Sequence, residues 1–568
     1  MTRNIYVQNA KCLTIPCLNV FVVSQDKPPI KVARVAKEVK PLINKTLPTP
    51  IKFHKLEQKV AGYNTADIQY LREGFSNRFY LGCSTATNNC LKVNNLKSAD
   101  LNPVSVQKYL EKEMSMNRIE GPLASLPFNF FQINPLGLVA KKEPNTFRAI
   151  VDLSFPPGKS INDSIPDLSA EVAYCSITEA VNRIIANGPN SFLSKVDIEK
   201  AFRLIPIHPK HYHQLCIHWQ GQFFIDKCLP MGARSACQLF ERFSSALEFA
   251  ALASGVNNLC HYLDDFLIIS NSKEQGLEDL NLFLDLCEEV KVPVAKNKTE
   301  GPVQILTFLG LEIDTIKEEI RLPSDKLSKC YALIDELLCR KKCTLRELQV
   351  ILGLLNFTCQ VIIPGRAFLR RLYALTAKVA KPYHSIHLTR ESKSDLLLWK
   401  QFLSSHNGIT LYRDELFLSP EVKHIFTDSS KTLAAAAVFG SAWFSLPWPS
   451  VWYCEQNITF LELIPIVWAI ETWGPLLRNC YLVVHTDNLA LKFILNSQSA
   501  KEVLVMNLVR RLVLCLLTNN IMFTAKHIPG YKNILADSLS RLRFDKFKQF
   551  FPTANPNPST TNPLPLEF

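Results

Sequence analysis

The chain has 568 residues, which is too long for one domain and predicts about three or four. Apolar residues make up 47% of it, so the composition excludes a disordered scaffold. The net charge of +13 favours a polyanionic partner. Seventeen scattered cysteines indicate reduced thiols, and no run of about eighteen uncharged apolar residues occurs. We therefore expect a soluble, intracellular protein without membrane association, with no preference between nucleus and cytoplasm.

The elements expected in the first half of the chain interleave without a regular repeat. In chain order they are a short helix near Asp67–Gly74, a helix over Pro103–Met116, strands over Leu138–Ala140 and Arg148–Val151, strands over Phe192–Val196 and Phe223–Ile225, and a helix over Ser235–Ala253. This irregular alternation favours an α+β fold over a doubly wound sheet.

The segment Tyr262-Leu263-Asp264-Asp265 lies between two apolar runs, as in a β-hairpin with two carboxylates at its tip. Adjacent ionised carboxylates repel each other. A divalent cation with oxygen ligands is the usual partner that offsets this repulsion. Asp197, at the end of an earlier apolar strand, is a candidate third ligand, although an isolated Asp at a strand end is more often a turn or cap residue.

The region after Asp314 is predicted to be helical and basic, with helices over Ser324–Leu338 and Thr344–Phe357 and a third helix after Pro364. Thr344 and Glu347 have capping-box spacing. Its basic side chains are Lys326, Lys329, Arg340, Lys341, Lys342, Arg346, Arg366, Arg370 and Arg371. Each of these basic residues, taken alone, is equally well explained as part of a solvent-exposed helix face. Taken together, they favour contact with phosphates.

A block over about 421–542 carries four further carboxylates: Asp428, Glu462, Asp487 and Asp537. Asp428 and Asp487 end apolar strands, where either is also a possible cap or turn residue, and Thr459-x-x-Glu462 has the spacing of a capping box. His527 precedes the last of them by ten positions in the segment His527–Arg541. A lone His at such a position is more often structural.

Several of these motifs resemble the palm of reverse transcriptases. The hairpin Tyr262–Asp265 and Asp197-x-x-x-Ala201-Phe202 are similar to its two carboxylate motifs. The resemblance implies that Asp197, Asp264 and Asp265 bind catalytic metal, and that the aromatic side chain of Phe202 lies against the nucleotide sugar. It places Tyr262 at the nucleotide site.

Further nucleotide contacts are implied by the same resemblance. Lys141 and Arg148, seven residues apart, correspond to the cations that hold the triphosphate, for which guanidinium–phosphate pairing is the physical reason. Gly232 permits close backbone approach, and Lys298 protonates the leaving pyrophosphate. Met231 stands where the family usually has Gln, which puts one sugar contact in doubt. The structural alternatives are a cross-strand charge pair for the two cations and a core phenylalanine at Phe202.

The second block resembles ribonuclease H. The resemblance implies that Asp428, Glu462, Asp487 and Asp537 bind two metal ions and that His527 assists product release. Several phrases are similar to those of DIRS-type retrotransposons: Pro135–Val139 with Lys141–Pro144, Asp152–Ser154, Ser160–Asp163, Lys298–Pro302, Leu352–Phe357 and Pro364–Leu372.

The predicted fold is α+β and multidomain: a right-hand polymerase with fingers, palm and thumb, followed by a ribonuclease H-like α/β domain. The predicted segments are a poorly ordered N-terminal extension (1–60), fingers and palm (61–318), a helical thumb or connection (319–415), the ribonuclease H-like domain (416–545) and a disordered Pro-rich tail (546–568).

The function implied by the resemblance is RNA-directed DNA synthesis with hydrolysis of the RNA in the RNA–DNA hybrid. It implies Mg²⁺ as cofactor, two per active site, with Mn²⁺ as a substitute. The expected partners are RNA template, DNA primer, RNA–DNA hybrid and dNTPs, and a separately encoded recombinase and packaging protein. Two alternatives remain: a decayed or domesticated protein that binds nucleic acid without catalysis, and a polymerase fragment of an LTR retrotransposon or pararetrovirus.

Overall fold

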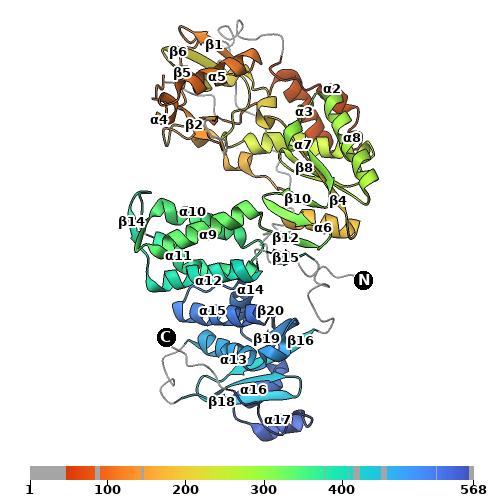
Figure 1. Ribbon diagram of the computed structural model, residues 1–568, viewed down its shortest axis with the longest axis vertical. Helices are drawn as coiled ribbons and strands as arrows, with labels where there is room; N and C mark the ends of the chain where they lie inside the picture. Colours follow the sequence, from red (N-terminus) through yellow and green to blue (C-terminus); the bar gives the residue numbers. More distant parts are fainter. Residues whose placement is uncertain are drawn as a thin grey trace, which may run out of the picture. The chain divides into compact units, whose positions relative to one another are not determined.

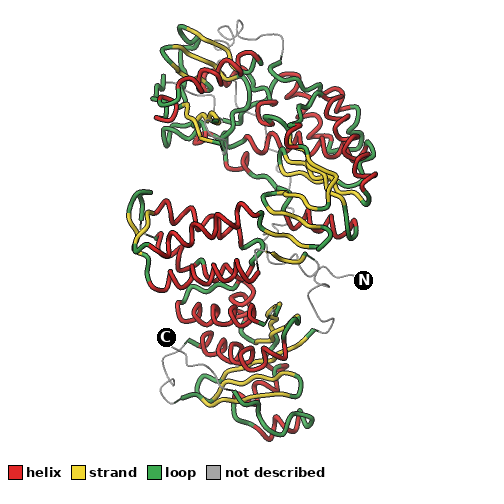
Figure 2. The backbone as a smooth tube through the Cα atoms, viewed as in Figure 1, coloured by secondary structure: helices red, strands yellow, loops and turns green. Residues whose placement is uncertain are grey.

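The computed structural model describes residues 47–83, 90–141, 146–377, 379–406, 409–412, 422–449, 457–519 and 521–561. The chain divides into two compact units. The N-terminal unit runs to Leu309 and takes in Ile313–Ile316, and the C-terminal unit comprises Gly310–Glu312 and the chain from Lys317. Helices and strands occur in both, which confirms the predicted α+β class (Figures 1 and 2).

An antiparallel sheet is the centre of the N-terminal unit. Its strands, in spatial order, are β7 (Leu259–Tyr262), β8 (Asp265–Ser270), β4 (Phe192–Asp197) and β9 (Glu300–Val303). It packs with helices α6 (Ile177–Asn187), α7 (Ala236–Ala253) and α8 (Lys273–Val290) (Figure 1). Phe240, Phe243, Phe266 and Phe283 are fully buried where these elements meet, so the sheet is anchored by aromatic packing.

A second part of the N-terminal unit consists of small sheets and a helix. Strands β1 (Ile119–Leu123), β6 (Gln222–Asp226) and β5 (Cys216–Trp219) form one sheet, and β2 (Leu136–Ala140) pairs with β3 (Phe147–Val151). Helix α5 (Pro103–Ser115) packs against them through Val106 and Leu110. The predicted helix at Pro103–Met116 and the predicted hairpin are both present.

The expectation of a poorly ordered extension up to residue 60 is wrong for its described part. Helix α2 (Phe53–Glu57) buries Phe53 and Leu56, and the Phe53 ring stacks on Phe75 of α3 (Thr65–Asn77) with centroids 5.3 Å apart. Two large apolar side chains in five residues are enough to dock a short helix despite the surrounding Pro and Lys. Residues 1–46 lie outside the described part.

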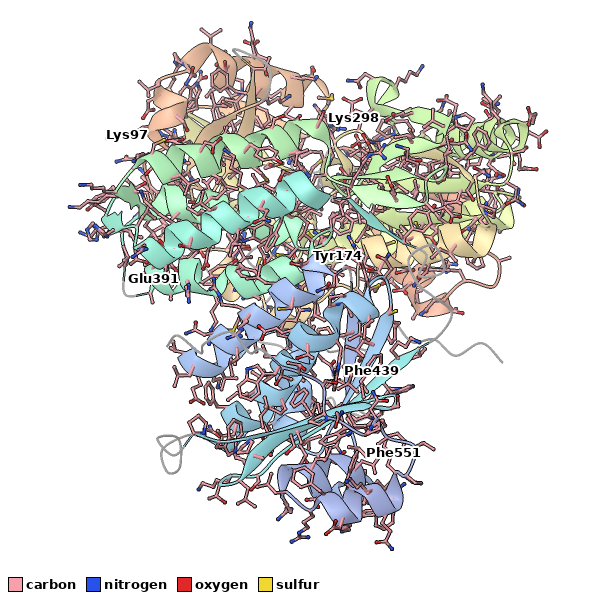
Figure 3. All side chains as sticks on the ribbon, turned by 60° about the horizontal axis from the view of Figure 1, so that its bottom comes forward. Lys97, Tyr174, Lys298, Glu391, Phe439 and Phe551 are labelled. Atoms are coloured by element: carbon pink, nitrogen blue, oxygen red, sulfur yellow. The ribbon has the colours of Figure 1, made fainter. Side chains whose placement is uncertain are left out.

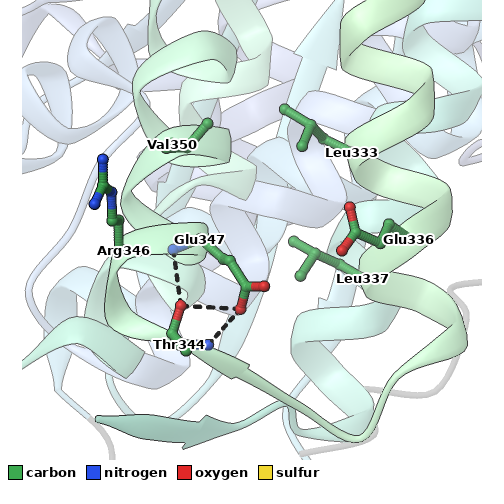
Figure 4. A pocket seen from close by; sticks show the side chains of 7 residues that line it. All are labelled: Leu333, Glu336, Leu337, Thr344, Arg346, Glu347 and Val350. Atoms are coloured by element: carbon green, nitrogen blue, oxygen red, sulfur yellow. Dashed lines mark hydrogen bonds between the residues drawn. The ribbon is translucent and has the colours of Figure 1, made fainter. Parts of the chain in front are cut away.

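The first part of the C-terminal unit is helical. Its helices are α9 (Ser324–Cys339), α10 (Leu345–Thr358), η7 (Ile363–Phe368), α11 (Arg370–Thr376) and α12 (Arg390–His406). Two short strand pairs accompany them: β12 (Glu319–Arg321) with β15 (Ile409–Leu411), and β13 (Lys342–Thr344) with β14 (Ser385–His387). The predicted capping box is confirmed: Thr344 and Glu347 exchange hydrogen bonds at the start of α10, beside a shallow groove between α9 and α10 (Figure 4).

The second part of the C-terminal unit is a five-stranded mixed sheet with helices. The strand order is β18 (Ala442–Pro447), β17 (Ala434–Phe439), β16 (Lys423–Ser429), β19 (Tyr481–Thr486) and β20 (Met522–His527). The first three strands are antiparallel and the last three parallel. Helices α13 (Ile458–Trp473), α14 (Leu489–Ser497), α15 (Val503–Thr518), α16 (Ile534–Ser540) and α17 (Phe544–Phe550) accompany it (Figure 1). This mixed sheet with its helices confirms the predicted α/β arrangement of the block.

Helix α13 is apolar on all sides because it is the core helix of this sheet. Within the described residues, Ile458–Leu477 is the one helical stretch long and apolar enough to cross a membrane, and 72% of its most apolar window is buried in the fold. It contacts β16, β17 and α15. Burial of most of this stretch in the fold accounts for its apolar composition.

The expectation of a disordered tail from residue 546 is wrong for residues 546–561. Phe547 on α17 packs on Trp443 of the edge strand β18, with centroids 5.2 Å apart, and Phe551 follows it (Figure 3). The backbone N–H groups of Asn555 and Ser559 donate to carbonyls of Ser441 and Trp443 at 2.8 and 2.7 Å. The Pro- and Asn-rich segment provides hydrogen-bond partners for backbone groups at an otherwise exposed sheet edge. Composition alone does not reveal this role. Residues 562–568 lie outside the described part.

Candidate active sites

The first carboxylate cluster lies at one end of the N-terminal sheet. Asp197 ends β4 and is the register partner of Asp265, the first residue of β8. Asp264 stands in the two-residue turn between β7 and β8, where its carbonyl accepts a hydrogen bond from the Ile198 N–H at 2.9 Å. Leu263, the other turn residue, has a φ of +54°, which is unfavourable for a side chain branched beyond Cβ. The structure therefore brings the three predicted Asp residues together.

The carboxylates of this cluster oppose one another's ionisation. Burial raises the pKa of Asp265 to about 6, with further contributions from Asp264 and Asp197. Burial also raises the pKa of Asp264, with Asp197 adding to the effect and Lys298 and Arg148 working against it. Because a bound cation relieves the repulsion between neighbouring carboxylates, such a cluster is suited to bind one.

Two lysines face this cluster. The Lys298 Nζ donates to both carboxylate oxygens of Asp197 at 2.9 Å, and the Lys195 Nζ donates to the carbonyl of Thr307 at 2.9 Å. A cavity of about 470 Å³ is lined by Lys195, Asp197, Asp265, Asn297, Lys298, Thr299 and Glu300. The sequence reasoning missed Lys195. Its signal is the strand period, since residues two apart on β4 share a face with Asp197.

The predicted sugar-contacting residue lies in a short turn after β4. Phe202 belongs to η4 (Ala201–Leu204), and its ring meets that of Phe240 edge-on, with centroids 5.6 Å apart. It is half-buried. Part of the ring is thus packed on the core helix α7 and part remains accessible.

The loop between β6 and α7 holds the predicted Gly232. This residue has a φ of +105°, and its carbonyl accepts a hydrogen bond from the Asn162 Nδ2 at 2.9 Å. Met231 before it is 49% exposed. The backbone conformation at Gly232 requires glycine, independently of any contact with a nucleotide.

The remaining predicted nucleotide contacts are spread over two hairpins. The Tyr262 ring packs against Tyr174 with centroids 4.9 Å apart. Arg148 on β3 is exposed and close enough to lower the pKa of Asp264. Lys141, also exposed, directly follows β2 at a turn whose residues 142–145 lie outside the described part. The structure thus relates Arg148, and not Lys141, to the carboxylates.

The second cluster gathers side chains from four elements of the C-terminal unit. Asp428 lies on β16, Glu462 on α13, Asp537 on α16, and Asp487 directly follows β19. The predicted capping box at Thr459 and Glu462 is wrong. Asn457 caps α13, its side chain accepting from the Thr459 N–H, so Glu462 stands in the second turn and not at the capping position.

Burial and repulsion from neighbouring carboxylates raise the pKa values of two members of this cluster, Glu462 and Asp428. Burial raises the pKa of Glu462 to about 7, with Asp487 and Asp428 adding to the effect and a hydrogen bond from Asn488 opposing it. Burial raises the pKa of Asp428 to about 6, again with Asp487 and Asp537 contributing and a hydrogen bond from Ser540 opposing it. The four carboxylates therefore interact as one group.

The end of β20 and the loop after it lie against Asp487. The His527 Nε2 lies 3.1 Å from the Asp487 carbonyl oxygen, so this nitrogen is the donor in that contact. A Cβ at Gly530 would stand 3.3 Å from the Asp487 Oδ2, which explains the need for a small residue there. The Arg541 Nε donates to the Asp537 Oδ1 at 2.6 Å. Ser540, Asn488 and Arg541 were not predicted, and each lies one to four positions from a predicted carboxylate.

The donor chemistry of both clusters suits a hard divalent cation, because every candidate ligand is a carboxylate. The Glu462 Oε2 is buried and has no hydrogen-bond partner among the described residues. As the side chains stand, no three His, Cys, Asp or Glu in the described ranges form a group that could hold a metal ion. Asp197 forms an ion pair with Lys298, and Asp537 forms one with Arg541.

Comparison with known proteins relates the first cluster to one enzyme family. Residues 144–313 match the family described as reverse transcriptase (RNA-dependent DNA polymerase). The matched segment contains Asp197, Asp264 and Asp265. This segment is therefore similar to the reverse transcriptase domains of Pol polyproteins and related transposon proteins.

Individual relatives are distant and longer. The Pro-Pol polyprotein of feline foamy virus is 28% identical over 229 residues, covering 38% of this chain and 18% of that polyprotein. The retrovirus-related Pol polyprotein from transposon 297 of Drosophila melanogaster is 21% identical over 464 residues (79% and 39%). The enzymatic polyprotein of cauliflower mosaic virus, strain Strasbourg, is 25% identical over 332 residues (55% and 44%). The chain spans less than half the length of these relatives.

Among solved structures, the foamy viral protease-reverse transcriptase dRH in complex with double-stranded DNA is 15% identical, with a TM-score of 0.47 and coverage of 88% of this chain and 84% of that one. The foamy viral protease-reverse transcriptase in complex with an RNA/DNA hybrid is 16% identical, also with a TM-score of 0.47, with coverage of 88% and 64%.

Proposed function

We propose that the chain is an RNA-directed DNA polymerase with ribonuclease H activity, which copies the RNA of a retroelement into DNA and hydrolyses the RNA of the resulting hybrid. The observation that carries the polymerase part is the cross-strand pair Asp197–Asp265 with Asp264 in the adjoining turn, inside the reverse transcriptase segment. Three carboxylates at one end of the sheet, two of which line a cavity together with Lys298, are suited to nucleotidyl transfer.

In this proposal Asp197, Asp264 and Asp265 would hold two magnesium ions, with manganese as a substitute, which when bound activate the primer hydroxyl and neutralise charge on the transferred phosphate. Lys298 contributes positive charge beside Asp197 and donates a proton to the leaving pyrophosphate. The exposed Arg148 binds the triphosphate of the dNTP. The accessible part of the Phe202 ring excludes a ribose 2′-hydroxyl.

The ribonuclease H part is supported by the second cluster. Asp428, Glu462, Asp487 and Asp537 would hold the corresponding pair of ions. Burial, together with Asp487 and Asp428, raises the pKa of Glu462 in the metal-free cluster, and a bound cation would lower that pKa again. His527, exposed beside Asp487, assists the release of the cleaved strand.

We also propose that the chain derives from a DIRS-type retrotransposon, on the strength of its sequence phrases. Its template, primer and hybrid partners would then be accompanied by a separately encoded tyrosine recombinase and packaging protein. Sequencing the flanking reading frames tests this assignment. A recombinase frame supports it, whereas frames for an aspartic protease and an acidic-triad integrase contradict it.

The activities are tested by extension of a DNA primer on an end-labelled RNA template in magnesium, so that synthesis and template cleavage are read from one reaction. Asp264→Asn/Asp265→Asn should abolish synthesis and retain cleavage of a preformed hybrid. Asp428→Asn should do the reverse. Tight hybrid binding by the wild type with neither activity would overturn the proposal in favour of a binding-only protein.

A further inference from the structure

A buried network of charges connects α5 to the turn that carries Phe202. The carboxylate of Glu113, on α5, is 3% exposed. Its Oε1 accepts a hydrogen bond from the Lys200 Nζ at 3.0 Å, and its Oε2 accepts one from the Arg203 Nε at 3.0 Å. Arg118 stands at 4.0 Å from Oε1. One carboxylate thus contacts the residues on both sides of Phe202.

The turn between these contacts has an unfavourable backbone. Lys200 has a φ of +54°, a region that a long side chain adopts at a cost of about 1–2 kcal/mol. Lys200 directly precedes η4, whose second residue is Phe202. The hydrogen bond from the Lys200 Nζ to Glu113 therefore supports the backbone conformation that sets the direction of the Phe202 side chain.

The same network reaches the loop of Gly232. The Arg203 Nη1 donates to the Asp226 Oδ2 at 2.7 Å, and the Cys228 N–H donates to the Asp226 Oδ1 at 3.1 Å. Asp226 ends β6, from which the chain continues directly into that loop. The turn of Phe202 and the loop of Gly232 are thus tied to each other through Arg203.

These ion pairs are better suited to fixing a conformation than to adding stability. Burial alone would raise the pKa of Glu113, but Arg203 and Lys200 more than offset it, so the carboxylate is ionised. Buried ion pairs often contribute little net stability, because desolvation opposes the attraction between the charges. A network that spans α5, η4 and β6 does restrict these elements to one relative placement.

We propose that Glu113 is a positioning residue that holds Phe202 against the sugar of the incoming nucleotide, and so determines the preference for dNTPs over rNTPs. This inference rests on the proposed polymerase function and assigns to α5 a part in substrate selection. Glu113 acts only through the turn of Phe202 and does not contact the nucleotide.

The test is single-nucleotide incorporation by the full chain, with kcat/KM measured for a dNTP and for the matching rNTP. Glu113→Gln keeps the size of the side chain and removes its charge. We expect the dNTP/rNTP ratio to fall about tenfold, a size typical of coupling between residues in one network. Glu120→Gln is the matched control, since Glu120 is bonded to Lys227 at 2.8 Å and not to the turn; its ratio should equal that of the wild type.

A double-variant cycle separates positioning from general damage. Phe202→Ala removes the side chain that Glu113 is proposed to position, so adding Glu113→Gln in that background should change the ratio less than about twofold. If Glu113→Gln does not fold, Lys200→Met removes one arm of the network at a side chain that is 27% exposed and should shift the ratio in the same direction.

Three outcomes would overturn the inference. If the wild type synthesises DNA and the folded Glu113→Gln or Lys200→Met variant has an unchanged dNTP/rNTP ratio, the role of Glu113 is rejected and the proposed function is not. An equal further loss in the Phe202→Ala background shows that Glu113 does not act through Phe202. Absence of synthesis by the wild type rejects the proposed function and this inference with it.

Discussion

The ammonium group of Lys298 lies 2.9 Å from both carboxylate oxygens of Asp197. The Lys298 side chain is 58% exposed, whereas that of Asp197 is 12% exposed. The chain thus supplies a solvated cation to a largely buried carboxylate, at the place where the proposed function requires a metal ion. Lys298 and a divalent cation compete for Asp197.

Removing this cation should strengthen metal binding while weakening synthesis. We predict that Lys298→Met lowers the Kd of the substrate-free chain for Mn²⁺, by at most about fivefold, because a solvated ion pair contributes about 0.2–1 kcal/mol. Titration calorimetry in an Asp428→Asn/Glu462→Gln background isolates the first cluster. Primer extension should fall, because the triphosphate loses a cationic contact.

Lys296→Met serves as the control, since Lys296 is a nearby exposed lysine of η6 (Lys296–Lys298). Its Mn²⁺ affinity should equal that of the wild type. Weaker Mn²⁺ binding by Lys298→Met would show that Lys298 orders the carboxylate for metal instead of competing with it.

The raised pKa of Glu462 predicts a pH-dependent stability of the metal-free chain. The folded chain keeps a proton up to a pKa of about 7, whereas the unfolded chain releases it near 4.5. Stability should therefore fall as pH rises between these values and stay low above pH 7. At pH 8 the free energy of unfolding of Glu462→Gln should exceed that of the wild type by about 1–2 kcal/mol, after allowance for the partial exposure of the side chain. At pH 4 the variant and the wild type should have the same free energy of unfolding.

Urea unfolding in EDTA measures this difference, with Glu502→Gln as the control at an exposed position. The control should stay within about 0.5 kcal/mol of the wild type at both pH values. A stabilisation by Glu462→Gln of the same size at pH 4 and pH 8 would mean that packing, and not charge, is responsible.

The ion pair of Asp395 and Arg510 joins the helical part of the C-terminal unit to its sheet part. Asp395, on α12, is fully buried, and its carboxylate accepts from the guanidinium of Arg510 on α15. That guanidinium also lies 4.8 Å from the ring centroid of Phe368. Asp395→Ala should destabilise the unit by about 3–5 kcal/mol, because it leaves a buried Arg unpaired.

A matched pair on the surface provides the contrast. Lys400 and Asp335 bond at 2.6 Å between α12 and α9, but their side chains are 44% and 51% exposed. Asp335→Ala should cost less than about 1 kcal/mol. Urea midpoints of the two variants measure the difference, and similar midpoints would contradict the role assigned to burial.

Local signals made much of the candidate sites predictable. Thr344 and Glu347 are three positions apart, so the capping box follows from the sequence. Asp197 and Asp265 were both identified as strand-end carboxylates. Their direct opposition was not predictable, because register depends on which strands pair, and β4 and β8 are separated by three helices and three strands in the chain.

The network of Glu113 shows what sequence reasoning loses at long range. Glu113 stands three positions after Leu110 and seven after Val106, on the buried face of α5. Its partners Lys200 and Arg203 are distant in the chain, and without them a Glu on a helix reads as solvent-facing. The fold, and not the local pattern, decides that this charge is buried.

A contrast between two glycines tests the loop at the first site. Gly232 has a φ of +105°, and a Cβ there would meet only the Val151 carbonyl oxygen, at 3.9 Å. The cost of Gly232→Ala is therefore one of backbone conformation, about 1–2 kcal/mol, and the loop should shift to relieve it. Gly353 lies on the exposed face of α10, and a Cβ added there would stand in open space, so Gly353→Ala should stabilise the chain by about 0.5–1 kcal/mol.

Urea unfolding should thus give effects of opposite sign for the two variants, and only Gly232→Ala should raise the KM for dNTPs. Wild-type stability and KM in Gly232→Ala would show that the loop does not depend on its positive φ.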